Sequence, residues 1–202
     1  MMKWSYWFGY IFFQSAARAL FGMRIIGREN LIMDGPVLLA PNHESFLDPP
    51  LIGLIYPDEV CFLARKTLFK GPAGPILRGW GAVPIDQDNP DIASLKGIIK
   101  RLRQGERVLV FPEGQRTYDG TLGTAEPGIG LIVSKARVPI QPIRIRGARE
   151  ALPRGAKRLW FHPISVTIGK PIRYTDAELK ALKGREGHRK IADRIMAAIA
   201  DL

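Results

Sequence analysis

The chain alternates short apolar runs with longer amphipathic segments, and this alternation limits the folds open to it. Residues 36–40, for example, are apolar and stop at Pro41, which is typical of a buried strand. Strands are expected at 36–40, 59–64, 81–86, 107–111, 139–146 and 164–169. Since helical segments separate them, the sequence predicts an α/β domain with a mixed, largely parallel sheet flanked by helices.

Three helices have the clearest signals. Residues 90–103 carry an apolar stripe between a candidate cap at Asn89 and a stop at Gly105. Thr175 and Glu178 have the spacing of a capping box, which predicts a helix start. The last expected helix has isoleucines at four-residue spacing: Ile191, Ile195 and Ile199.

Length indicates a single domain, and cysteine content indicates that it has no disulfide bonds. A chain of 202 residues can bury most of its apolar surface in a single core. Its one cysteine, Cys61, lies in an apolar run and is expected to be a buried thiol rather than a nucleophile. No disulfide can form within the chain, so nothing points to an oxidising compartment.

The formal net charge of +11 favours anionic partners. Anionic membranes, phosphorylated small molecules, acidic proteins and nucleic acid all fit this charge. Basic residues gather between residues 144 and 158, but no helix-turn-helix, zinc-finger or RNP-type pattern accompanies them. Nucleic acid is therefore excluded as the expected partner.

The N-terminus is aromatic. Residues 4–17 contain no charge, but they are too few for a spanning helix, which needs about 20. Trp and Tyr favour the lipid headgroup boundary, so residues 1–24 are predicted to form a monotopic interface helix before a domain of residues 25–202. The alternative is a signal peptide cleaved near residues 15–17. The aromatic residues are Trp4, Tyr6, Trp7, Phe8, Tyr10, Phe12 and Phe13.

His43 and Asp48 lie five positions apart on the turn after the first of these strands. Asp48 is expected to be a helix N-cap, with Pro49 at the first helical position. If the turn folds back, the Asp48 carboxylate reaches one imidazole nitrogen and leaves the other free to accept a proton. The alternative is that Asp48 only caps the helix and His43 is an ordinary turn residue.

A second polar turn, residues 111–117, follows another expected strand. Polar turns at the carboxyl ends of strands gather at one edge of such sheets, so His43 and Glu113 are expected to share a site. The sequence lacks H-E-x-x-H and any other histidine spacing typical of metal ligands, so no metal is expected. It also lacks the G-x-S-x-G of serine hydrolases, and Ser45 is too near His43 to be its nucleophile.

Five segments, in order, resemble motifs of the glycerolipid acyltransferase family, in particular the bacterial lysophosphatidate acyltransferases. They are N-H-x4-D at 42–48, A-R-K-T-L at 64–68, G-A-V-P-I-D-Q at 81–87, F-P-E-G-Q-R-T at 111–117 and V-P-I-Q-P-I at 138–143. The resemblance covers roughly residues 25–150. The chain departs from the family pattern at Gln87, Gln115 and Glu126, where arginine, threonine and lysine are usual.

The resemblance implies transfer of a fatty acyl group from acyl-CoA or acyl carrier protein to the sn-2 hydroxyl of 1-acylglycerol-3-phosphate, giving phosphatidate. No cofactor is implied beyond this thioester co-substrate. His43 would be the general base and Asp48 would orient it. The implied location is the cytoplasmic face of a bacterial inner membrane.

Acceptor binding is expected to use a second set of residues. Arg116 and Lys66 would bind the acceptor phosphate, Gly114 would let the backbone approach the ligand, and Glu113 would orient Arg116 or a glycerol hydroxyl. The alternatives without a binding role are a Glu113–Arg116 salt bridge that stiffens the turn and a Lys66 that is only solvated. Two other functions stay open: a same-family enzyme acting on another lyso-lipid, such as a lyso-aminolipid, and a non-catalytic lipid-binding protein.

Overall fold

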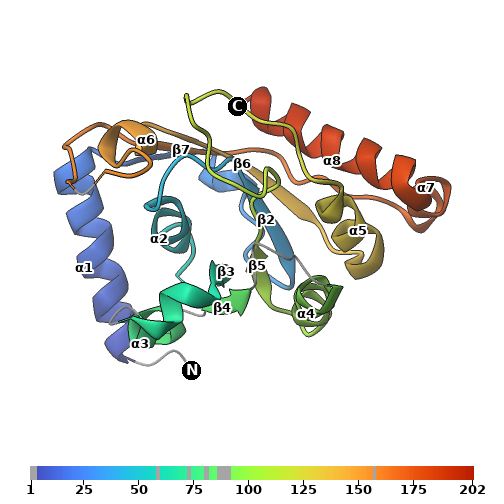
Figure 1. The fold of residues 1–202 in the computed structure, drawn as a ribbon, viewed down its shortest axis with the longest axis horizontal. Coiled ribbons are helices and arrows are strands. Elements are labelled where there is room, and N and C mark those ends of the chain that lie inside the picture. The colour runs from blue at the N-terminus through green and yellow to red at the C-terminus, as the bar shows by residue number, and fades with distance from the viewer. Residues whose placement is uncertain (1–3, 58–59, 72–73, 80–81, 86–91, 157) are drawn as a thin grey trace.

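The structure is a computed structural model. It describes residues 4–202 except 58–59, 72–73, 80–81, 86–91 and 157 (Figure 1). The strands are β1 (Arg24–Ile26), β2 (Val37–Pro41), β3 (Cys61–Arg65), β4 (Ala82–Ile85), β5 (Arg107–Leu109), β6 (Ile140–Arg146) and β7 (Ser165–Ile168). The α-helices are α1 (Trp4–Phe21), α2 (Asp48–Gly53), α3 (Gly74–Gly79), α4 (Ile92–Arg103), α5 (Pro127–Ala136), α6 (Ala148–Ala151), α7 (Asp176–Ala181) and α8 (Gly184–Ala200). Two 3-10 turns are η1 (Arg28–Asn30) and η2 (Lys66–Lys70).

All seven strands form one sheet in the order β1-β7-β6-β2-β5-β3-β4. The strands from β6 to β4 in this order run parallel to one another. β7 is antiparallel to β6, and β1 is parallel to β7. The expected mixed, largely parallel α/β sheet is confirmed. All six predicted strands are present, and the three-residue β1 is an addition that the sequence did not reveal.

Strand direction decides which segments meet at each edge of the sheet. The turns after β2, β3 and β5 leave the sheet at the carboxyl ends of the parallel strands. Because β1 and β7 run the opposite way, they begin at that same edge. The end of α1 and the loop that precedes β7 therefore lie on the edge that holds the two polar turns.

Helices cover both faces of the sheet (Figure 1). α1, α2 and α6 lie on one face and contribute to one apolar cluster, whereas α4, α5 and α8 cover the other face with a second cluster. Neighbouring residues of the central strand β2 alternate between the two: Leu39 belongs to the first and Leu38 to the second. Both are fully buried, which explains why the β2 sequence is apolar without alternation.

The helix predictions agree with the structure where it describes them. The capping box of Thr175 and Glu178 starts α7, and the predicted isoleucines of α8 are buried. α4 ends at Arg103 as expected, while the predicted cap Asn89 and the residue after it lie outside the described residues. Cys61 is buried, as predicted.

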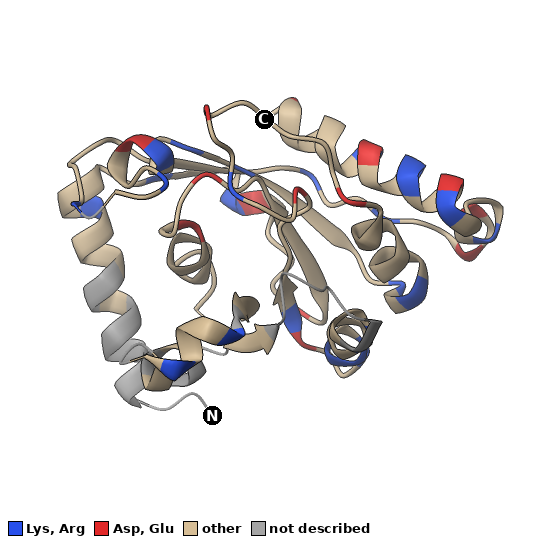
Figure 2. Cartoon of the chain, viewed as in Figure 1, with Lys and Arg blue, Asp and Glu red and all other residues tan. Residues whose placement is uncertain are grey.

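α1 packs its C-terminal end onto the domain. Ala17 and Phe21 are buried, and Gln14 Nε2 donates to the Leu54 carbonyl at 3.2 Å. The aromatic side chains near the N-terminus lie outside what the structure describes, so the interface helix stays a prediction. Charged residues are spread along α8, whereas the described part of α1 has Arg18 in its last turn (Figure 2). No helix in the described residues has the length and apolar character to cross a bilayer.

The close contact between α5 and α8 depends on a glycine. A Cβ built on Gly130 of α5 would lie 2.0 Å from the backbone oxygen of His188 on α8. Gly130→Ala should therefore lower the free energy of unfolding by about 1–3 kcal/mol, because forced separation of packed helices outweighs the helix propensity of alanine, worth about 1 kcal/mol. Urea unfolding measures this change.

Gly97, on α4, is the matched control because a Cβ there would meet nothing within 4 Å. Gly97→Ala should raise the free energy of unfolding by about 0.5–1 kcal/mol. Equal effects of the two substitutions would show that α5 and α8 are not held at this distance.

Candidate functional site

The site begins where β2 ends and the chain turns toward α2. Asn42, the first residue beyond the strand, is buried and holds the turn against β6. Its Oδ1 accepts from the Ile145 backbone N–H at 2.6 Å, and its Nδ2 donates to the Ile145 carbonyl at 3.0 Å. A side chain that pairs with both backbone groups of a neighbouring strand fixes the point from which His43 departs.

Asp48 closes the turn. Its carboxylate is completely buried, and Oδ2 accepts hydrogen bonds from the backbone N–H groups of Glu44 at 2.6 Å and Ser45 at 2.7 Å. The predicted N-cap role is wrong: Leu47 is the N-cap residue, and Asp48 and Pro49 occupy the first two positions of α2. The carboxylate turns back to the loop before the helix instead of bonding to the helix itself.

The imidazole of His43 is the third group on the same Asp48 oxygen. Nδ1 lies 2.7 Å from Asp48 Oδ2, so Nε2 is the nitrogen left for a substrate proton. The imidazole stacks on Phe111, with ring centroids 3.7 Å apart and planes 13° apart. The carboxylate sets the tautomer and the aromatic ring limits rotation, while 16% of the side chain stays exposed.

The second polar turn forms hydrogen bonds to both backbone groups of His43. Glu113 Oε1 accepts from the His43 N–H at 2.9 Å, and the Thr117 N–H donates to the His43 carbonyl at 2.9 Å. Glu113 Oε2 accepts from the Gly123 N–H at 2.8 Å. Glu113 was expected to orient Arg116 or a glycerol hydroxyl. That role stays a prediction. In the structure, this buried carboxylate joins the His43 turn to Gly123, in the loop between β5 and α5.

Arg116 contacts the first turn by a cation–π interaction with Phe46. Its guanidinium carbon lies 3.6 Å from the centroid of Phe46, between His43 and Asp48 in the chain. Gly114 has φ +69°, a left-handed conformation that side chains other than glycine rarely adopt. The glycine is therefore needed for the turn itself, whatever its part in ligand approach.

Lys66 is exposed and begins η2 directly after β3. β3 is parallel to β5, so Lys66 lies on the edge that also carries the turn of residues 111–117. The structure thus joins His43, Asp48, Glu113 and Arg116 through contacts and places Lys66 on the same edge. Of the motif at 81–87, Gly81, Asp86 and Gln87 lie outside the described residues.

Two ionisable residues at the site, Glu44 and Arg144, were not predicted as site residues. Burial, followed by the negative charge of Asp48, raises the pKa of Glu44 to about 7. Arg144 lies on β6, where burial and then the charge of Arg146 lower its pKa, while Glu44 and Glu113 oppose that shift. The only signal for Arg144 is its position between Ile143 and Ile145 in an expected buried strand. The same pattern occurs where every second strand residue faces solvent, so it does not identify a site residue.

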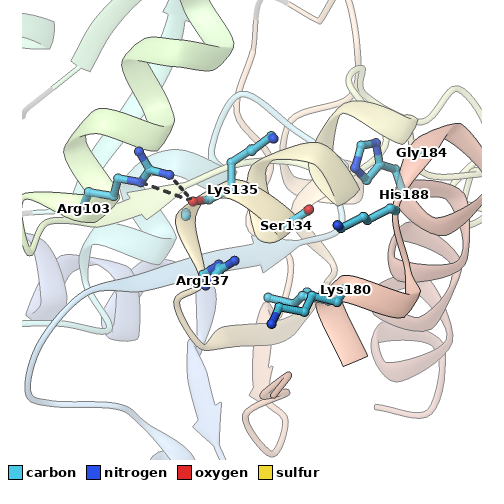
Figure 3. Close-up of a pocket in the computed structure, with 10 residues that line it drawn as sticks. Arg103, Ser134, Lys135, Arg137, Lys180, Gly184 and His188 are labelled. Atoms are coloured by element: carbon cyan, nitrogen blue, oxygen red, sulfur yellow. Dashed lines mark hydrogen bonds between the residues drawn. The ribbon is translucent and has the colours of Figure 1, made fainter. Parts of the chain in front are cut away.

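A separate cavity of about 620 Å³ lies at the C-terminal end of α5 (Figure 3). The N-terminal end of α5 is the one near the turn of residues 111–117. Two of the basic residues that line it have structural partners. Arg103 donates twice to the Lys135 carbonyl at the end of α5, and Arg137 pairs with Asp176 at 3.0 Å. Within the described residues, no group of three or more His, Cys, Asp or Glu could hold a metal ion.

The raised pKa of Glu44 gives a pH test of the site. The pKa of Glu44 is about 7 in the folded state, whereas the usual pKa of a glutamate is 4.5. Between these values the folded chain binds more protons than the unfolded chain, so this group makes the free energy of unfolding fall as pH rises. Glu44→Gln should remove that slope, measured by urea unfolding across the window, and Glu29→Gln, at an exposed residue of η1, should keep it. Parallel pH curves for wild type and Glu44→Gln would contradict the assignment.

Comparisons with known proteins identify the family of this chain. A family model described as Acyltransferase matches residues 22–146. A 1-acyl-sn-glycerol-3-phosphate acyltransferase of Bacillus subtilis is 30% identical over 158 residues, which is 77% of this chain and 76% of that protein. A chloroplastic relative of the same description from Brassica napus is 33% identical over 84% of this chain, but the chain spans only 49% of its length.

A solved structure has the same fold. The crystal structure of the 1-acyl-sn-glycerophosphate acyltransferase PlsC from Thermotoga maritima superposes with a TM-score of 0.70 and 24% sequence identity. The match covers 93% of this chain and 77% of that one. The family model spans more than half of the chain, including both polar turns, and the chain therefore belongs to the acyltransferase family.

Proposed function

We propose that the protein transfers a fatty acyl group from an acyl thioester to the sn-2 hydroxyl of 1-acylglycerol-3-phosphate, giving phosphatidate. The observation that carries this proposal is the 2.7 Å contact between His43 Nδ1 and a buried carboxylate oxygen of Asp48. The names of the relatives support the substrate class, since those described above are 1-acylglycerol-phosphate acyltransferases. The thioester donor is acyl-CoA or acyl carrier protein.

In the proposed mechanism the substrate supplies the nucleophile. The acceptor hydroxyl attacks the thioester carbonyl carbon, and His43 Nε2 takes the hydroxyl proton as the new C–O bond forms. The tetrahedral intermediate then expels the thiol by breaking the C–S bond, and the imidazolium returns the proton to the leaving sulfur. Proton and acyl group balance without a cofactor or a covalent acyl-protein.

Asp48 makes His43 suited to this work. A fully buried carboxylate on Nδ1 fixes the tautomer with Nε2 unprotonated and stabilises the imidazolium formed during attack. The two backbone N–H groups on the same oxygen hold the carboxylate in place, and the stacked Phe111 keeps the ring in one orientation. Little reorganisation is then needed when the proton moves.

The acceptor phosphate would lie against Arg116 and Lys66. Arg116 offers a planar donor fork and is held over Phe46, in the same turn as His43. Arg144 adds positive charge close to Glu44 and Glu113. A same-family enzyme acting on a lyso-aminolipid is the second candidate, but an acceptor without a phosphomonoester would have little use for this set of cations.

We place the protein on the cytoplasmic face of a bacterial inner membrane, with α1 lying in the lipid interface. The aromatic composition of the N-terminus and the net charge of +11 support this location. A panel of lyso-lipid acceptors, offered with both donor classes and read by product mass, tests the activity. Product from a lyso-aminolipid but not from 1-acylglycerol-3-phosphate would replace the first candidate with the second.

His43→Ala should lower kcat for acyl transfer by about 10²- to 10⁴-fold, since a general base is lost. The fold should survive because the Glu113 and Thr117 bonds use the backbone of this residue, not its imidazole. Steady-state kinetics and a melting curve measure the two effects. Near-normal turnover by a folded variant would remove His43 from the mechanism.

Asp48→Asn distinguishes two roles of Asp48: orienting the His43 imidazole and closing the turn. The amide oxygen can still accept the two backbone N–H groups, but it no longer provides a charge for the imidazolium, so kcat should fall by about 10²- to 10⁴-fold at a modest loss of thermal stability. Circular dichroism melting accompanies the kinetics. Lost stability with unchanged kcat would show that Asp48 only closes the turn.

Arg116→Ala should raise KM for the phosphorylated acceptor by about tenfold or more, since a charge-assisted phosphate contact is lost in the bound substrate. Titrations of acceptor and donor, each at saturating partner, provide the measurement. Arg103→Ala is the matched control because Arg103 ends α4 and bonds to the Lys135 carbonyl near the C-terminal end of α5, away from the candidate site. A raised KM for donor alone would assign Arg116 to the donor's phosphates instead.

A further inference from the structure

We propose that the loop of residues 152–163 is a second membrane contact, which inserts Trp160 and Phe161 into the surface of an anionic bilayer beside the catalytic turn. This inference rests on the proposed function in one respect: if the acceptor is a membrane lipid, the site must face the bilayer to receive it. It adds a lipid-binding surface that is independent of α1 in sequence.

The apolar side chains of this loop are held in solvent. Three consecutive residues are exposed, with fractions of 45% for Leu159, 61% for Trp160 and 76% for Phe161. Backbone hydrogen bonds support both sides of the segment. The Trp160 N–H donates to the Ala151 carbonyl at 2.8 Å, and the Ile164 N–H donates to the Phe21 carbonyl at 3.0 Å. A supported loop that presents adjacent large apolar side chains to water indicates a contact surface.

The loop lies on the catalytic edge of the sheet. It leads into Ser165, the first residue of β7, at the edge where β2 ends. A direct contact joins it to the catalytic turn, because Ser45 Oγ donates to the Leu152 carbonyl at 2.8 Å. Ile164, the residue after the loop, bonds to Phe21 at the end of α1. The loop therefore bridges α1 and the turn that carries His43.

Aromatic and basic side chains continue this surface across the site. The Arg154 guanidinium carbon lies 4.1 Å from the centroid of Tyr118, which is 68% exposed. Arg154 Nη1 also donates to the Arg116 carbonyl at 3.4 Å, and Arg116 stacks on the exposed Phe46. Cations on aromatic faces keep their charge at the headgroups while the rings enter the interface.

Charge identifies the occupant as anionic lipid. The sequence from residue 152 to 163 contains Arg154, Lys157 and Arg158 and no acidic residue. An acidic protein would also attract these cations, but protruding Trp and Phe flanked by basic residues fit the boundary between acyl chains and anionic headgroups. Basic residues and exposed aromatics lie on the same edge as the site for a lipid substrate.

Vesicle binding by the full chain tests the surface. Trp160→Ser/Phe161→Ser should weaken partitioning onto vesicles of equal phosphatidylglycerol and phosphatidylcholine by about tenfold or more, since two interfacial side chains are removed. The matched control is Ile26→Ser/Met33→Ser. These residues are also exposed, by 51% and 45%, and Ile26 ends β1 at the opposite edge of the sheet. Sedimentation should show wild-type binding for this control. Equal binding by the two double variants would overturn the proposal.

A second measurement places Trp160 directly. In a chain with Trp4, Trp7 and Trp80 replaced by Phe, Trp160 is the only tryptophan. Its emission should shift to the blue and be quenched by brominated phosphatidylglycerol in the bilayer. Unchanged, unquenched emission from vesicle-bound protein, or the same shift with a soluble acidic polypeptide alone, would overturn the proposal.

The two proposals fail in distinguishable ways. Vesicle binding and quenching require no turnover, so an inactive protein with a lipid-quenched Trp160 would reject only the proposed function. An active protein whose Trp160 stays in water would reject only the membrane contact. Activity on detergent-dispersed acceptor should stay near wild type in Trp160→Ser/Phe161→Ser, which checks that the catalytic turn is intact.

Discussion

One buried carboxylate oxygen organises the candidate site. Asp48 Oδ2 accepts from the imidazole of His43 and from two backbone N–H groups of the turn between them. A carboxylate without such donors would be costly to bury, and a turn without the carboxylate would leave those N–H groups unsatisfied. Folding the turn and orienting the histidine are therefore one event, not two separate demands on the sequence.

This turn is also secured from outside, by groups distant in the chain. Asn42 attaches its start to β6, Glu113 and Thr117 hold the backbone of His43, and Ser45 bonds to the loop after α6. Each attachment comes from an element on the same edge of the sheet. The parallel arrangement of β2, β5 and β6 is therefore what holds the histidine in place, and the apolar clusters on the two faces of the sheet support the site indirectly.

Local patterns in the sequence were enough for much of the fold. Six strands and the capping box of α7 follow from apolar runs, Gly and Pro breaks, and short-range spacing, all of which act within a few residues. β1 was missed because three residues carry too little pattern.

Long-range contacts explain what the sequence did not reveal at the site. Asp48 was read as a cap because its sequence position suits one, but its oxygen bonds backward into the turn. Both oxygens of Glu113 accept from backbone groups, one of them 70 residues away, and no side-chain spacing encodes that. The stacking of Phe111 on His43 likewise depends on how β5 lies beside β2.

If the protein works at a membrane as proposed, the reversal of direction between β6 and β7 shortens the path of a lipid acceptor to His43. If β7 and β1 ran with the other strands, the Trp160 loop and the end of α1 would emerge at the far edge of the sheet, one strand length from His43. A strand of the length of β2, five residues, spans about 16 Å. A lysolipid would then have to be lifted by roughly half the thickness of the hydrocarbon core, about 30 Å in all, before its hydroxyl met the base. In the proposed membrane orientation, the antiparallel pairing of β7 with β6 removes that extraction step, and the acceptor would react while its acyl chain is still in the bilayer.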